Sequence, residues 1–114
     1  YTYAGLASWI FPRYCRDELA AAIGDASALG VRKYYVEDSW GEWVDGPLPW
    51  IVKVLLTDPT QDPKHLQRQF CNTAYGAAAE VMDAYFNYLQ EVWQSAPRGK
   101  WFDGLYESGE QARR

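Results

Sequence analysis

The sequence has few of the residues that build metal sites and nucleophilic sites. It contains one histidine, His65, and two cysteines, Cys15 and Cys71. These residues do not cluster at metal-ligand spacing, and no cysteine–histidine pair is placed for nucleophilic attack. A Gly-rich phosphate loop and a serine elbow are also absent. The sequence therefore predicts no metal and no cofactor.

Positive charge and long apolar runs are scarce too. The chain has 11 Lys and Arg against 15 Asp and Glu, which gives a net charge of -4. Its basic residues are scattered and form no stripe that could neutralise phosphates, which argues against a nucleic-acid partner. No apolar run approaches the length of a membrane span, so we expect no membrane partner.

Two buried thiols are the favoured interpretation of the cysteines, while one long-range disulfide stays open.

Aromatic residues are abundant, and many gather with acids in residues 34–47. There a predicted strand runs into Glu37 and Asp38, and then into a loop that carries Trp40 and Trp43. Carboxylates and indole rings just past the end of a strand suit a sugar site, because acids exchange protons and flat rings stack on a pyranose. The alternative is a loop whose tryptophans fill a core and whose acids cap the next helix.

Strand and helix patterns alternate early in the chain and then give way to helices. Strands are predicted over 1–6 and 31–37, with a helix over 16–29 that ends at Gly30. The second strand is apolar with little alternation, which is typical of a parallel strand buried on both faces. Further helices are predicted over 47–56, 63–75 and 77–94. The last has one broad apolar face, made of Val81, Met82, Tyr85, Leu89, Val92 and Trp93.

Two strands do not make a stable sheet without neighbours. We therefore predict an α/β protein: the C-terminal part of a (β/α)8 TIM-type barrel, followed by a helical extension. Residues 1–46 would hold the last two barrel strands, the helix between them and the active-face loop. Residues 47–97 would form C-terminal helices, and residues 98–114 a polar tail. The remainder of the barrel is expected upstream in a longer protein.

An ordered set of motifs extends from residue 33 to about residue 93. It comprises Tyr35-Val36-Glu37, Trp40-Gly41, Asp45-Gly46-Pro47, Trp50, Lys53-Val54-Leu55-Leu56-Thr57-Asp58-Pro59, Asp62, Leu66, Phe70-Cys71, Tyr75-Gly76-Ala77-Ala78-Ala79, Met82 and Tyr85-Phe86. This set resembles a bacterial family, the domain of unknown function 4838, whose members look like glycoside-hydrolase-type TIM barrels distantly similar to α-glucuronidases. The resemblance implies carbohydrate chemistry, a general acid on an upstream strand, and a secreted or periplasmic location.

Glu37 is the predicted catalytic residue, because catalytic side chains collect at the C-terminal ends of barrel strands. It would be one carboxylate of an acid/base pair or a ligand for a sugar hydroxyl. The alternative is a structural acid paired with an arginine such as Arg13. The predicted substrate-binding residues, for which core filling or lid packing is the alternative, are Trp40, Trp43, Asp38, Tyr3 and Trp9.

These expectations describe a glycoside-hydrolase-like protein that acts on an oligo- or polysaccharide by paired-carboxylate hydrolysis. Its partners would be the carbohydrate substrate and the rest of its own barrel. Two other functions stay open. One is a non-catalytic carbohydrate-binding barrel protein, and the other is a helical protein-interaction module in which Trp residues anchor an interface. The interaction module predicts an exposed aromatic patch on the 77–94 helix rather than around Glu37.

Overall fold

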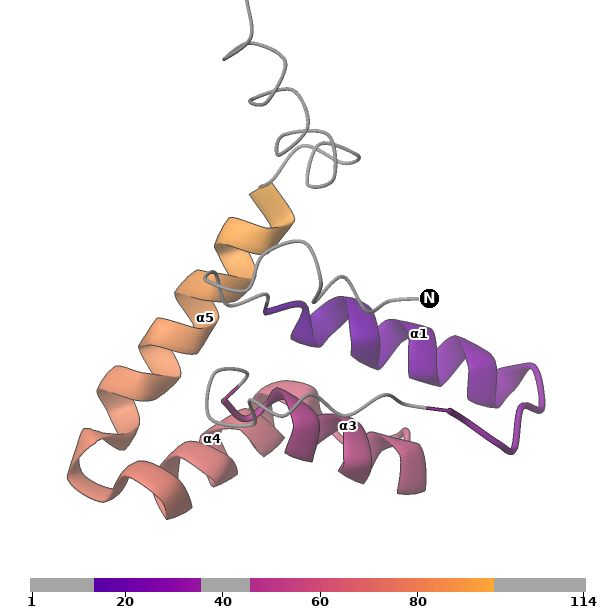
Figure 1. Cartoon of the computed structure of the whole chain (residues 1–114), viewed down its shortest axis with the longest axis horizontal. Coiled ribbons are helices and arrows are strands. Elements are labelled where there is room, and N and C mark those ends of the chain that lie inside the picture. Colours follow the sequence, from indigo (N-terminus) through magenta and orange to yellow (C-terminus); the bar gives the residue numbers. More distant parts are fainter. Residues whose placement is uncertain (1–13, 36–45, 96–114) are drawn as a thin grey trace, which may run out of the picture.

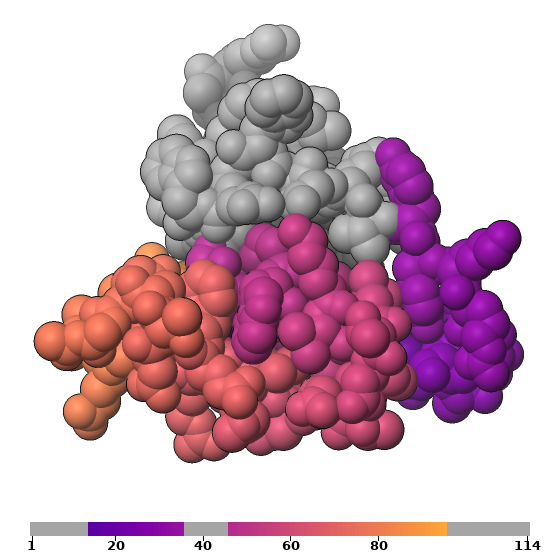
Figure 2. All heavy atoms as spheres, turned by 90° about the horizontal axis from the view of Figure 1, so that it is seen from below, coloured from indigo at the N-terminus to yellow at the C-terminus, as the bar shows by residue number. Residues whose placement is uncertain are grey.

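The computed structural model describes residues 14–35 and 46–95. Helices account for 78% of these residues, which contain no β-strand. The helices are α1 (Arg16–Ala28), α3 (Leu48–Thr57), α4 (Pro63–Tyr75) and α5 (Ala79–Ser95), with a short 3-10 turn, η2 (Gly76–Ala78), ahead of α5. Helix α4 contacts α1, α3 and α5, and the chain turns sharply between α4 and α5 (Figure 1). Seen from below, α3 and α4 form the middle of the surface, with residues 14–35 along one side (Figure 2).

The prediction of an α/β fold with a TIM-type barrel is wrong for the described part of the chain, which is entirely helical apart from turns and connections. Residues 31–35, the described part of the predicted strand 31–37, are irregular and exposed, and Tyr35 is 87% exposed. A short apolar run does not by itself distinguish a buried strand from other structure. A strand also needs a neighbouring backbone to satisfy its N–H and C=O groups. The predicted strand 1–6 lies outside the described residues.

The predicted bounds of α4 are confirmed and those of α1 differ by one residue at its end, because local signals encode them, whereas the helix predicted from residue 77 begins at Ala79. Helix α1 ends in a Schellman motif: Gly30 has φ +83°, its N–H donates to the Ser27 carbonyl, and the Val31 N–H donates to the Ala26 carbonyl. Asp62 caps α4 by accepting a hydrogen bond from the Lys64 N–H at 3.0 Å. Helix α3 follows Pro47, which is its N-cap and makes no side-chain cap bond.

Two apolar clusters hold the helices together. One lies between α1, α3 and α4 and contains the buried side chains of Ile23, Ile51, Leu55 and Leu66. The other joins α5 to the rest and contains Tyr14, Leu48, Cys71, Ala79 and Phe86. Cys71 is therefore a buried thiol, as predicted. Helix α5 enters the core chiefly through Phe86, whose ring centroid lies 5.2 Å from that of Tyr14 and 6.3 Å from that of Tyr75.

The apolar face predicted for α5 is only partly buried in the structure. The buried residues of α5 are Ala79, Phe86 and Gln90. Met82, Leu89 and Trp93 are half-buried, whereas Val81, Tyr85 and Val92 are exposed. The helix is thus rotated about its axis relative to the prediction. The reason is that polar residues of α5 take part in the helix packing, as described below.

Gly46 lies at a position that accepts no side chain. Its φ is +57°, and a Cβ placed on it would overlap ring carbons of Phe86. Gly30 also has a positive φ, but no atom lies within 4 Å of where its Cβ would be. A side chain at Gly30 would therefore meet backbone strain alone, whereas a side chain at Gly46 would meet both backbone strain and steric overlap.

We expect Gly46→Ala to lower the free energy of unfolding by about 3 kcal/mol or more, since strain and overpacking act together. Gly30→Ala should lower it by only about 1 kcal/mol, because the alanine would meet the unfavourable positive φ but no neighbouring atom. Urea denaturation followed by circular dichroism measures both. Equal losses in the two variants would show that the Phe86 ring does not restrict Gly46.

Candidate functional site

The residues predicted to form a sugar site lie outside the described residues, so their roles stay predictions. They are Glu37, Asp38, Trp40, Trp43, Tyr3 and Trp9. Within residues 14–35 and 46–95, no three His, Cys, Asp or Glu side chains come together as a metal site would require. His65 is exposed in the first turn of α4. None of the described helices is long and apolar enough to cross a membrane.

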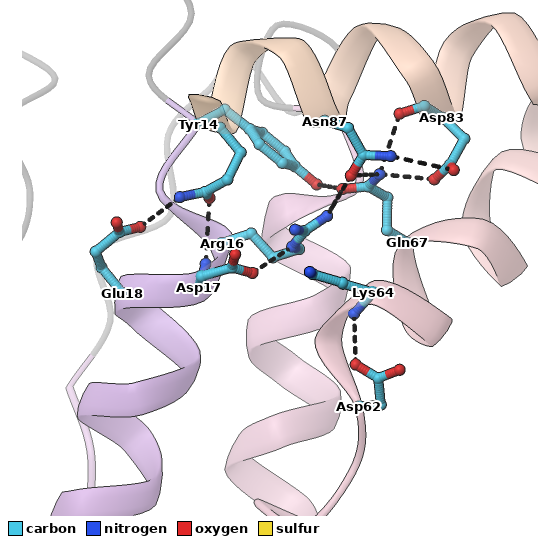
Figure 3. A network of polar contacts seen from close by, with 10 residues as sticks. Tyr14, Arg16, Asp17, Glu18, Asp62, Lys64, Gln67, Asp83 and Asn87 are labelled. Atoms are coloured by element: carbon cyan, nitrogen blue, oxygen red, sulfur yellow. Dashed lines mark hydrogen bonds and ion pairs between the residues drawn. The ribbon is translucent and has the colours of Figure 1, made fainter. Parts of the chain in front are cut away.

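The described helices meet instead at a buried polar cluster centred on Gln67 (Figure 3). Its Oε1 accepts hydrogen bonds from the Tyr14 hydroxyl at 2.7 Å and from Arg16 Nη1. Its Nε2 donates to Asp83 Oδ1 at 2.6 Å and to Asn87 Oδ1 at 3.1 Å. One amide on α4 therefore joins the start of α1 to the middle of α5.

Arg16 carries a buried positive charge in the same cluster. Its Nε donates to Asp17 Oδ1 at 2.7 Å, and its Nη1 donates to Asn87 Oδ1 at 2.9 Å. Nearby, the Gln90 amide bridges to α1, since it accepts from the Asp17 N–H and donates to Glu18 Oε2 at 2.7 Å. A buried cation is tolerated only when paired and hydrogen-bonded, and these contacts supply that pairing.

Tyr14 in this cluster and Cys71 in the adjoining apolar cluster are both held in their neutral forms. Burial raises the pKa of the Tyr14 phenol well above its usual range, although the Arg16 cation opposes that shift. Burial, helped by the Asp83 charge, raises the pKa of the Cys71 thiol to about 11. Tyr14 therefore stays a hydrogen-bond donor, and Cys71 is not a thiolate near neutral pH. The contacts of the cluster position the helices relative to one another.

Sequence reasoning missed this cluster, although a signal was present. Asp83, Asn87 and Gln90 recur at helical spacing, so they lie along one side of α5. In the structure that side faces α4 and the start of α1. A polar stripe beside an apolar one is usually taken as the solvent-exposed side of a helix, and here it is not.

The opposite side of α5 carries an exposed apolar stripe of four residues, which we call the α5 stripe. It consists of Val81, Tyr85, Tyr88 and Val92, which are 71%, 44%, 61% and 39% exposed. Their spacing of i, i+4, i+7 and i+11 places them in line along about three turns of helix. The exposed aromatic patch that the interaction-module interpretation predicted on this helix is therefore present, with tyrosines in place of tryptophans.

We expect Gln67→Met to lower the free energy of unfolding by about 2–4 kcal/mol, because it leaves the hydroxyl, guanidinium and carboxylate around it short of partners. Gln69→Met, at an exposed position on the same helix, is the matched control and should change it by less than about 0.5 kcal/mol. Urea denaturation of both variants tests this. A small effect of Gln67→Met would mean that the cluster does not stabilise the packing of α5.

Comparison with known proteins gives a family and no individual relative. The family model described as "Domain of unknown function (DUF4838)" matches residues 2–87. No curated protein and no solved structure matches the chain. The matched range includes the Gln67 cluster up to Asn87 and the first two residues of the α5 stripe. Because the match covers most of the 114 residues, the chain belongs to the DUF4838 family, as the ordered motifs in its sequence predicted.

Proposed function

We propose that the helical part of this chain is a protein-interaction module and that the α5 stripe is its contact surface. The observation that carries the proposal is the alignment of four exposed apolar side chains, Val81, Tyr85, Tyr88 and Val92, on one face of one helix. Single exposed apolar residues are ordinary on protein surfaces, whereas a continuous apolar strip is typical of a binding surface.

The spacing of the stripe suits recognition between helices. Anchors at i, i+4, i+7 and i+11 are the pattern by which one helix packs along another or into a groove. Tyrosine is a frequent anchor at interfaces, because its ring buries a large area and its hydroxyl can still form a hydrogen bond. Tyr85 and Tyr88 lie in the middle of the stripe, where an anchor contributes most.

The Gln67 cluster supports this role from the other side of the helix. Asp83 and Asn87 are tied to α4 through Gln67, and Gln90 is tied to α1 through Glu18. These contacts fix the rotation of α5, so the stripe is presented in one orientation before any partner arrives. A surface ordered in advance loses less conformational entropy on binding.

The test is site-specific photo-crosslinking of the full chain in the cells that produce it. A photoreactive phenylalanine analogue at Tyr88 should yield a discrete crosslinked species, and the same analogue at Asn72, an exposed position on α4, should not. Combining the Tyr88 probe with Val81→Ser and Val92→Ser should remove the species, since both side chains are exposed and their loss spares the core. Equal crosslinking at Tyr88 and Asn72, or none at Tyr88, would overturn the proposal.

A carbohydrate-related activity is a second proposal, and it rests on other residues. The family match covers every residue of the predicted sugar site, from Tyr3 to Trp43. The function of the family is described as unknown, so support for sugar chemistry comes from the acids and indoles themselves.

Glu37→Gln tests the carbohydrate proposal in the full-length protein. If Glu37 is one of two paired carboxylates, hydrolysis of aryl glycosides or polysaccharides should fall by about two orders of magnitude or more, with the helical circular dichroism unchanged. Glu42→Gln, five residues further along the sequence, is the control and should keep the parental rate. Unchanged activity in Glu37→Gln would assign that residue a structural role.

A further inference from the structure

The α5 stripe is bordered on one side by two acids. Glu80 and Glu91 are both exposed. At 100° per residue they lie on the same side of the stripe, one near each end. Neither glutamate forms a salt bridge with another residue in the described ranges 14–35 and 46–95.

The helix itself supplies no positive charge to balance them. Helix α5 has no Lys or Arg, and its last turn contains no basic residue. The sequence has none from residue 69 to residue 97. The C-terminal end of a helix carries partial negative charge, which adds to that of Glu91. The two glutamates therefore place negative charge beside the stripe near each of its ends.

From this juxtaposition we propose that the partner of the α5 stripe is an amphipathic helix whose apolar face is bordered by Lys or Arg. The inference rests on the proposed interaction function and names the chemistry of the partner. Apolar anchors would pack on Val81, Tyr85, Tyr88 and Val92, and basic side chains beside them would reach Glu80 and Glu91. Complementary charge at the rim of an interface selects the partner and its orientation more than it adds affinity.

Two other occupants fit the charge less well. A second copy of this chain, packed antiparallel and stripe to stripe, would bring two acidic borders together. In parallel packing the borders would lie on opposite sides, and neither α5 would offer them a basic residue. An anionic lipid surface attracts amphipathic helices that carry Lys and Arg on the polar face, whereas the charged residues of α5 are all acids. A basic amphipathic helix could both pack on the α5 stripe and pair its charges with Glu80 and Glu91.

The test compares two labelled synthetic peptides with the full chain. Both are helices of about 20 residues with leucines at i, i+4, i+7 and i+11, and they differ only in having Lys or Glu beside the leucines. Fluorescence anisotropy should show the Lys peptide binding about fivefold to tenfold more tightly than the Glu peptide at low salt, with the difference shrinking at high salt.

Single charge reversals locate the effect. Glu91→Lys should reduce or reverse the preference for the Lys peptide, whereas Asp25→Lys, an equal change in net charge at an exposed position on α1, should preserve it. The basic partner is overturned if both peptides bind with the same affinity, or if Asp25→Lys reduces the preference for the Lys peptide as much as Glu91→Lys does. In either case the docking role of the stripe stands. If neither peptide binds, the basic partner is likewise overturned, and crosslinking at Tyr88 decides the docking role separately.

Discussion

The packing of these helices depends on one buried amide. Gln67 lies where the start of α1, the middle of α4 and the middle of α5 meet. It accepts hydrogen bonds from the start of α1 and its flanking Tyr14, and it donates hydrogen bonds to α5. The amide suits this place because its oxygen can face the donors Tyr14 and Arg16 while its nitrogen faces the oxygens of Asp83 and Asn87. A charged or apolar side chain there would leave one of these groups unpaired in the interior, which is costly.

The arrangement of α5 follows from that requirement. The buried guanidinium of Arg16 needs an acceptor on α5, and Asn87 provides one. Turning Asn87 and Asp83 inward necessarily turns Val81, Tyr85 and Tyr88 outward, because the two sets lie on different sides of the helix. The interior thus gains a satisfied polar cluster, and the surface gains an apolar stripe. The exposure of the stripe is a consequence of how the interior is paired.

Family membership and the helices were accessible from sequence, whereas the fold class and the packing were not. The motif run from Lys53 to Ala79 was ordered enough to identify DUF4838, and the match confirms it. The α/β prediction depended on residues 31–35 being a buried strand, and they are exposed instead. Of the residues proposed for function, the acids and tryptophans around Glu37 lie outside the described residues. Three residues of the α5 stripe, Val81, Tyr85 and Val92, belonged to the predicted apolar face of this helix, and Tyr88 did not.

What the sequence by itself determined is local: where α1 stops at Gly30, where α4 starts at Asp62 and where it ends at Gly76. These signals act within a few residues, through backbone angles and caps, and need no distant partner. The tertiary structure alone decided which side of α5 is buried. That choice depends on Tyr14 and Gln67, which are 53 residues apart, and on Arg16 and Asn87, which are 71 apart. A helix with two apolar sides can bury either one, and only the polar groups opposite it select between them.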